Sequence, residues 1–148
     1  MRTNCRFAMA VHVLAVLAYR EGDRVTSAFL ARSVNTNPVI IRRLLLSLQK
    51  ARLVETGKGA GGGSRLRRSP RRINLAEIYR AVEETEVFAA PARKPSPACP
   101  VGHCIREALD PVFSSAQAAL ERDLAKTTLG GIMDAVKAAG AGRGKKAV

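Results

Sequence analysis

Basic side chains are concentrated in one stretch of the sequence, and their chemistry is that of polyanion binding. Between residues 42 and 72 the chain carries ten basic residues, opposed only by the carboxylate of Glu55. They are Arg42, Arg43, Lys50, Arg52, Lys58, Arg65, Arg67, Arg68, Arg71 and Arg72. Such groups neutralise phosphates, and a guanidinium also donates two hydrogen bonds to O6 and N7 of guanine. With a formal net charge of +13, the cluster predicts a nucleic-acid partner, a solvated basic face being the alternative.

A second group of reactive side chains lies further along the chain, where Cys99 and Cys104 are separated by four residues that include His103. Two such thiols can be oxidised to a disulfide, and a helix N-terminus can lower the pKa of one of them. Thiolates and imidazoles also bind metals, so these three residues are weak candidate ligands. They fall short of the four ligands that a [2Fe–2S] cluster takes. Inert thiols are the remaining alternative, and we expect no cofactor.

Several functional classes lack the residues that they need. An enzyme is not expected, because the sequence has only two histidines, no conspicuous pair of carboxylates and no nucleophile elbow. The basic stretch holds no aromatic side chain on which RNA bases would stack. No apolar run approaches the ~20 residues of a membrane span. The N-terminus lacks a signal-peptide cleavage site, and three cysteines form no disulfide framework. We therefore expect a cytoplasmic protein with no membrane partner.

Helical patterns surround the start of the basic stretch. Apolar residues at helical spacing predict a first helix over residues 5–20, ending at the turn-like sequence of residues 21–23. Thr26 can cap a second helix that runs to Arg32. Asn37 as N-cap and Pro38 as the first helical residue start a third helix, whose buried stripe is Ile41, Leu44, Leu45 and Leu48. Two short helices joined by a tight polar turn predict a helix-turn-helix.

The third helix has an outward face that suits a DNA groove. At ~100° per residue, the side opposite the buried stripe carries Val39, Arg43, Leu46 and Lys50, with Arg42 at its edge. Arg42 or Arg43 can read guanine, and Val39 can contact a thymine methyl group. Lys50 and Arg52 are better placed for phosphates. We predict that Asn37 and Pro38, at the start of this helix, also lie at the DNA.

A β-hairpin follows the third helix in this prediction. Residues 53–56 read as a strand, residues 57–64 contain five glycines, and residues 65–68 can return as a second strand. Strand, glycine-rich loop and strand after a helix-turn-helix form a wing. Lys58 or Arg65 can enter a minor groove, while Arg67 and Arg68 contact flanking phosphates. The loop lacks the Gly-Lys-Ser/Thr ending of a nucleotide-binding loop.

The rest of the chain suggests a second, helical unit. Asn74 and Glu77 have capping-box spacing at the start of a helix. Prolines 91, 95, 97 and 100 predict an irregular linker. A long helix over residues 102–126, interrupted at Pro111, carries an apolar stripe that needs a partner, either its own domain or a second copy. We predict four parts: a DNA-binding domain over 1–84, a linker or sensor loop over 85–101, a dimerisation helix and short last helix over 102–138, and a disordered basic tail over 139–148.

Five stretches of the sequence together resemble the Rrf2 family of bacterial winged-helix regulators, which includes the iron–sulfur cluster regulator and the nitric-oxide-sensitive repressor. They are residues 6–14, residues 35–45, Leu53-Val54 leading into residues 59–63, residues 73–83 and residues 99–102. The resemblance covers roughly residues 5–125. The wing together with Ile78-Tyr79-Arg80-Ala81-Val82-Glu83 is its most specific part.

The resemblance implies a mainly α fold with a small β-wing and a long C-terminal helix swapped against a partner subunit. It also implies a DNA-binding regulator, repressing as a homodimer on a near-palindromic operator in double-stranded DNA, with Lys58 at the minor groove. Cluster-binding members carry three cysteines near the dimerisation helix, whereas this chain has only Cys99 and Cys104 there. Cysteine-based redox sensing by Cys99 or Cys104 is thus a candidate signal, with inert thiols as the alternative. The alternatives are an iron–sulfur-cluster-dependent regulator and a non-specific nucleic-acid-binding or membrane-surface protein.

Overall fold

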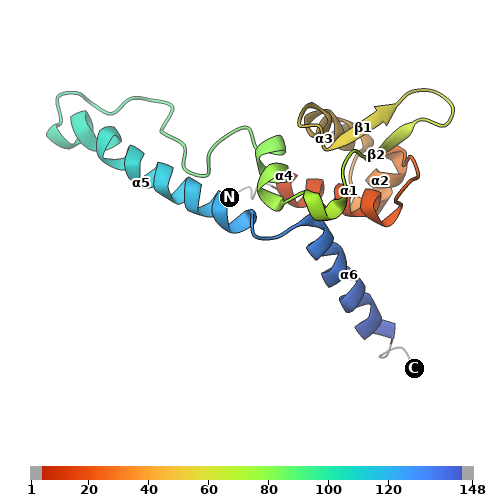
Figure 1. Ribbon diagram of the computed structural model, residues 1–148. Coiled ribbons are helices and arrows are strands. Elements are labelled where there is room, and N and C mark those ends of the chain that lie inside the picture. The colour runs from red at the N-terminus through yellow and green to blue at the C-terminus, as the bar shows by residue number, and fades with distance from the viewer. Residues whose placement is uncertain (1–4, 145–148) are drawn as a thin grey trace.

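The computed structural model describes residues 5–144 and is mainly helical with one small antiparallel sheet (Figure 1). Its elements are α1 (Arg6–Tyr19), α2 (Ser27–Val34), α3 (Pro38–Lys50), β1 (Val54–Gly57), β2 (Gly63–Leu66), the 3-10 helix η1 (Pro70–Arg72), α4 (Leu75–Val82), α5 (Pro100–Leu124) and α6 (Leu129–Gly144). The predicted fold class, a winged helix-turn-helix followed by a long helix, is confirmed. None of the described helices combines the length and apolarity that a membrane crossing requires.

The helix-turn-helix forms because its polar residues satisfy helix ends while its apolar residues share one core. The Thr26 hydroxyl accepts a hydrogen bond from the Phe29 N–H at 3.2 Å, and Asn37 accepts one from the Val39 N–H at 2.8 Å. Both predicted N-caps are therefore confirmed. Between the two helices Asn35 adopts φ 60°, a left-handed conformation that asparagine tolerates. The predicted stripe of α3 is buried, with Ile41 and Leu48 fully enclosed.

The wing is a two-stranded hairpin that pairs Val54 with Leu66 and Gly57 with Gly63. Its second strand begins two residues before the predicted start at Arg65. The reason is a third backbone partner, because Val25 and Ser64 exchange two N–H to O bonds of 2.9 and 2.8 Å. Gly63, at φ +130°, lies so close to Val25 that a Cβ atom there would meet its carbonyl oxygen at 2.8 Å. Glycine at this position thus allows the wing to pair with the helix-turn-helix.

The predicted capping box starts α4. It lies where residues 73–75 form backbone hydrogen bonds with residues 127–129. Asn74 accepts a bond from the Glu77 N–H, and Glu77 accepts one from the Asn74 N–H, both at 3.0 Å. Between these two segments, Leu75 N–H donates to the Thr127 carbonyl at 2.9 Å, and Leu129 N–H donates to Ile73 at 2.8 Å. Leu129 is fully buried in the same core as the first helices. The start of α6 is thereby part of the N-terminal core.

The linker leads from α4 away from this core, and α5 returns alongside it toward the core (Figure 1). No α5 residue is buried. The prediction placed the helix over 102–126 with an interruption at Pro111, but one element runs from Pro100 to Leu124 with Pro111 inside it. The disordered tail predicted from residue 139 is wrong for residues 139–144, because α6 continues through Gly144. Ala139 and Ala141 in this stretch favour helix, although three glycines alternate with them. Residues 145–148 of the predicted tail lie outside the described residues.

We expect Asn74→Ala to lower the free energy of unfolding by about 1 kcal/mol, because it removes the side-chain acceptor of the α4 capping box. Urea unfolding followed by circular dichroism measures the change. Gln49→Ala, at an exposed helical position, is the matched control and should change stability much less. Equal effects of the two substitutions would contradict the role assigned to this cap.

Candidate nucleic-acid interface

The outward face of α3 exposes an apolar and basic surface. Val39 and Leu46 are 46% and 58% exposed, and Arg42, Arg43 and Lys50 are exposed around them. A free helix in water gains nothing from presenting bulky apolar side chains, but base methyl groups and sugars supply apolar contacts in a groove. Ile40, at 40% exposure, is an additional residue on this surface that the helical wheel did not single out.

The first residues of α3 serve the helix as well as its surface. The Asn37 side-chain oxygen is engaged by the Val39 N–H, so Asn37 positions the helix start through its own cap. Pro38 is half-buried as the first helical residue, where its missing N–H costs nothing. Asn37 and Pro38, both predicted to bind DNA, therefore stabilise the start of α3. The side chains of Val39, Arg42 and Arg43 are exposed to solvent.

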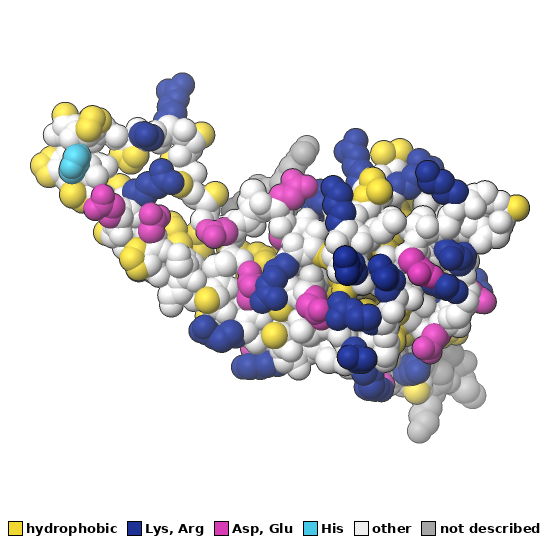
Figure 2. Space-filling view, turned by 45° about the horizontal axis from the view of Figure 1, so that its top comes forward, with side chains coloured by type: hydrophobic (Ala, Val, Ile, Leu, Met, Phe, Trp, Pro, Cys, Tyr) yellow, Lys and Arg dark blue, Asp and Glu magenta, His cyan; other side chains and the backbone are white. Residues whose placement is uncertain are grey.

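The cations of α3 and of the wing tip have no ion-pair partner in the part of the chain that the structure describes. Within residues 5–144 no carboxylate lies in ion-pair range of Arg42, Arg43, Lys50 or Lys58, and none of these side chains makes a hydrogen bond. Lys58 follows β1 directly and leads into a loop in which Gly59 and Gly61 adopt positive φ. Figure 2 shows Lys and Arg side chains crowding the half of the molecule that carries α3 and the wing. Unneutralised charges at this density favour a polyanion.

Arg65 and Arg24 hold the one acidic residue of the wing. Glu55 accepts a hydrogen bond from the Arg65 guanidinium and lies 3.7 Å from Arg24. The hydrogen bond from Arg65, with the nearby charges of Arg24 and Arg67, holds the pKa of Glu55 below its ordinary value. Arg24 also donates to the Gly63 carbonyl at 3.3 Å. Glu55 therefore stays ionised near neutral pH and fixes the positions of the two arginines, which leaves Arg65 less free to enter a minor groove than predicted.

Arg68 and Arg71 join the wing to the helices behind it. Arg68 donates to the Glu77 carboxylate at 2.9 Å, and Arg71 forms two bonds of 3.0 and 2.9 Å to Asp134 of α6. Partial burial raises the pKa of Glu77, but the hydrogen bonds from the Asn74 N–H and from Arg68 outweigh it and lower the pKa overall. Among the arginines predicted to contact flanking phosphates, Arg68 and Arg71 are held by carboxylates, whereas Arg67 and Arg72 have no ion-pair partner among the described residues.

Arg24 was missed by the sequence analysis. Its guanidinium lies against the backbone of the wing, 2.7 Å from where a Cβ atom at Gly57 would be. The local sequence around residue 24 is a turn and carries no sign of this contact, because the pairing of Val25 with Ser64 is non-local. The absence of a side chain at Gly57 was the one available signal, since it permits another group to approach the strand closely.

The two candidate sensor cysteines lie at the start of α5 and are both exposed. Cys99 is the N-cap residue. The backbone N–H groups of Gly102 and Val101 face its sulfur and lower the pKa of the Cys99 thiol. Cys104 lies in the next turn. The direction of this pKa shift agrees with the effect predicted for a thiol at a helix N-terminus.

An iron–sulfur cluster does not fit the donors that the described residues bring together. Cys99, His103 and Cys104 share the first turns of α5, while Cys5 precedes α1. Among residues 5–144 no three His, Cys, Asp or Glu side chains are grouped closely enough to hold a metal ion. A [2Fe–2S] cluster needs four ligands. This region therefore offers thiol chemistry without a complete ligand set in one chain.

Comparison with protein families gives one match over most of the chain. Residues 3–135 match the Rrf2 family, described as iron-dependent transcriptional regulators. The chain is 41% identical over 131 residues to the HTH-type transcriptional regulator YwnA of Bacillus subtilis, covering 88% of this chain and 96% of YwnA. It is 35% identical over 86 residues to the HTH-type transcriptional regulator IscR of Cereibacter sphaeroides, covering 57% of this chain and 56% of IscR.

Solved structures agree in fold. A crystal structure of a protein described as DNA-binding superposes with a TM-score of 0.67 at 39% identity, over 86% of this chain and 98% of that one. A transcriptional regulator from Lactobacillus plantarum superposes with a TM-score of 0.76 at 24% identity, over 90% of each chain.

We expect Arg43→Ala to reduce discrimination between cognate and altered duplexes by about 1–3 kcal/mol at particular base pairs, the value of a bidentate guanine contact. Fluorescence anisotropy with a set of single-base operator variants measures it. Lys137→Ala removes one exposed charge from α6 and is the matched control. An equal loss of affinity by Arg43→Ala for cognate and random duplexes would place Arg43 away from the bases.

We expect Lys58→Ala to weaken binding to every duplex and to reduce the slope of log affinity against log salt by about one, because it removes one phosphate or minor-groove cation. Anisotropy titrations over a range of salt concentrations provide the slope. A sequence-dependent loss with an unchanged slope would instead make Lys58 a base reader.

Proposed function

The chain belongs to the Rrf2 family of transcriptional regulators, and on that basis we propose that it represses transcription as a homodimer bound to a near-palindromic operator. The observation that carries the proposal is the exposure of basic side chains on α3 and at the wing tip. Arg42, Arg43, Lys50 and Lys58 have no partner among the described residues. Two such surfaces related by a two-fold axis read two half-sites separated by whole helical turns of DNA. A dimer bound over a promoter excludes the polymerase from it.

The dimer is proposed from apolar surface that a single chain leaves open. Val101 and Val112 of α5 are 66% and 60% exposed, on a helix that has none of its residues buried. A groove of about 670 Å³ between α1, α2 and α6 is also open, with Tyr19 and Val136 at 76% and 55% exposure on it. Burying apolar surface of this kind stabilises an assembly, and a second copy supplies matching surface by symmetry.

The apolar stripe predicted on α5, which includes Ile105, Leu109, Val112 and Phe113, does not face a single partner. Ile105, Leu109 and Phe113 line a space shared with the linker, whereas Val112 does not. We therefore assign the dimer contact to the side of α5 that carries Val101 and Val112.

Thiol oxidation is the proposed signal, and no cofactor is needed for it. Cys99 is exposed and has a lowered pKa, so it forms the thiolate that attacks an oxidant or a second thiol. Two thiols give one disulfide and pass two electrons and two protons to a peroxide, which leaves as two waters. Both cysteines lie where the linker meets α5. A new bond there changes the angle between the two subunits and hence the spacing of their recognition helices.

The proposed dimer predicts a particle of twice the chain mass in multi-angle light scattering at micromolar concentration. Val112→Asp should shift it toward the monomer, because it places an unpaired charge in the contact. Ala118→Asp adds the same charge to an exposed position on another side of α5 and should leave the dimer intact. A monomeric wild type with a folded α5 would exclude the homodimer.

The proposed signal predicts that diamide or mild peroxide lowers the operator affinity of the wild type, and that dithiothreitol restores it. Cys99→Ser and Cys104→Ser should each abolish the response, whereas Cys5→Ser should retain it. Oxidised wild type that binds as tightly as the reduced protein would exclude the thiol switch and leave the DNA-binding assignment untouched.

A further inference from the structure

The linker between α4 and α5 is fastened to α5 at two separated points. Near its start, the Val87 N–H donates to the Gln117 side chain at 3.2 Å, and the rings of Phe88 and Phe113 stack at 5.1 Å with 19° between their planes. Near its end, Ser96 lies so close to Gly102 that a Cβ atom at Gly102 would meet its carbonyl oxygen at 2.6 Å. Prolines between and beside these points stiffen the segment. The linker is therefore a strap attached at both ends.

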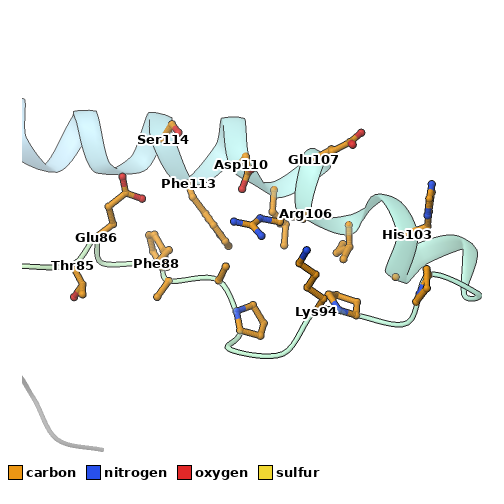
Figure 3. A pocket seen from close by; sticks show the side chains of 18 residues that line it. Thr85, Glu86, Phe88, Lys94, His103, Arg106, Glu107, Asp110, Phe113 and Ser114 are labelled. Atoms are coloured by element: carbon orange, nitrogen blue, oxygen red, sulfur yellow. The ribbon is translucent and has the colours of Figure 1, made fainter.

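Between the two attachment points the strap stands off the helix and leaves a cavity of about 890 Å³ (Figure 3). Its apolar wall includes Ile105, Leu109, Phe88 and Phe113. This volume lies within the range of small-molecule sites, which combine an apolar lining with a few placed polar groups. The exposed valines assigned to the dimer, Val101 and Val112, do not line it.

Two cations enter this cavity from opposite walls. Figure 3 shows the Lys94 ammonium rising from the strap toward the Arg106 guanidinium of α5. Within the described part of the chain neither group has a carboxylate in ion-pair range. Glu107 points away from the strap, and Glu86 lies at the other end beside Phe113. Asp110 lies on the same side as Arg106 but forms no ion pair with it. Two like charges facing each other across an apolar space complement an anion.

We propose that this cavity binds a small organic carboxylate with an apolar or aromatic body. The carboxylate lies between Lys94 and Arg106, and the apolar body lies against Ile105, Leu109 and the Phe88–Phe113 pair. This site goes beyond the proposed function, since it holds a ligand whether or not the chain binds an operator.

Binding there has a route to the DNA-binding domain. Gln117, which holds the strap, also donates to the Tyr79 hydroxyl at 3.3 Å, and Arg80 donates to Glu121 at 2.7 Å. Both contacts join α5 to α4, whose Glu77 holds Arg68 behind the wing. A ligand that draws the strap toward α5 acts on the helix that carries these contacts.

Phenylacetate is the probe, titrated into the full chain labelled at its isoleucine δ1 methyl groups. We expect saturable shifts of the Ile105 methyl signal in carbon–proton NMR spectra, with Ile73 and Ile78 in the core and Ile132 in the α6 groove unshifted. Calorimetry under the same conditions should give one site per chain. Phenylacetamide, the neutral analogue of the same shape, should bind at least tenfold more weakly, and affinity for phenylacetate should fall with salt.

The double variant Lys94→Gln/Arg106→Gln should lose at least tenfold in phenylacetate affinity. Both side chains are exposed, so the fold does not depend on them. Arg122→Gln/Lys126→Gln removes the same charge at and just beyond the C-terminal end of α5 and should bind as the wild type does. Absence of saturable binding, equal binding of phenylacetamide, shifts at Ile132 in place of Ile105, or full affinity in the double variant would each overturn the proposal. None of these measurements involves DNA, so their failure is separate from a failure of operator binding.

Discussion

The joint between residues 73–75 and residues 127–129 is the contact on which the rest of the structure depends. Ile73 and Leu129 are fully buried, and two backbone hydrogen bonds of 2.8 and 2.9 Å connect the two segments. The 3-10 helix η1 that follows the wing ends just before this joint, α4 begins within it, and α5 passes into α6 on its other side. Backbone bonds between buried segments are costly to break, since each leaves unsatisfied polar groups. The direction of α5, and with it the orientation of any partner, is therefore fixed relative to the wing.

Carboxylates on this framework separate the basic residues into two groups. Those behind the wing are paired, with Arg68 on Glu77 and Arg71 on Asp134, and they connect the wing to α4 and α6. Those on α3 and at the wing tip have no such partners among the described residues. Exposed ion pairs contribute little to the free energy of unfolding, so the main effect of the first group is to orient the wing relative to α4 and α6. The second group retains its full charge for phosphates and bases.

Local sequence signals predicted the elements whose ends are set locally. Helix starts could be predicted from single capping residues, because capping needs only neighbouring N–H groups. These residues are Thr26, Asn37 and the Asn74–Glu77 capping box. The stripe of α3 followed from helical spacing alone. Non-local contacts explain the differences. Strand β2 begins earlier than predicted because Val25 pairs with Ser64, and the role of Arg24 depends on that same pairing. The apolar stripe of α5 is partly covered by the linker, whose path cannot be predicted from helical periodicity. The extent of α6 was underestimated because Gly140, Gly142 and Gly144 near its end are typical of a disordered tail.

The central claim is that two copies of this chain present two recognition helices to one DNA duplex. Selection of bound sequences from a pool of random duplexes, followed by sequencing, tests that claim and does not require the operator sequence as input. The account predicts an enriched, near-palindromic motif whose half-sites are separated by about one helical turn, ~10 base pairs, or a multiple of it. Enrichment of a single half-site without a symmetric mate, or no enrichment over the starting pool, would contradict it.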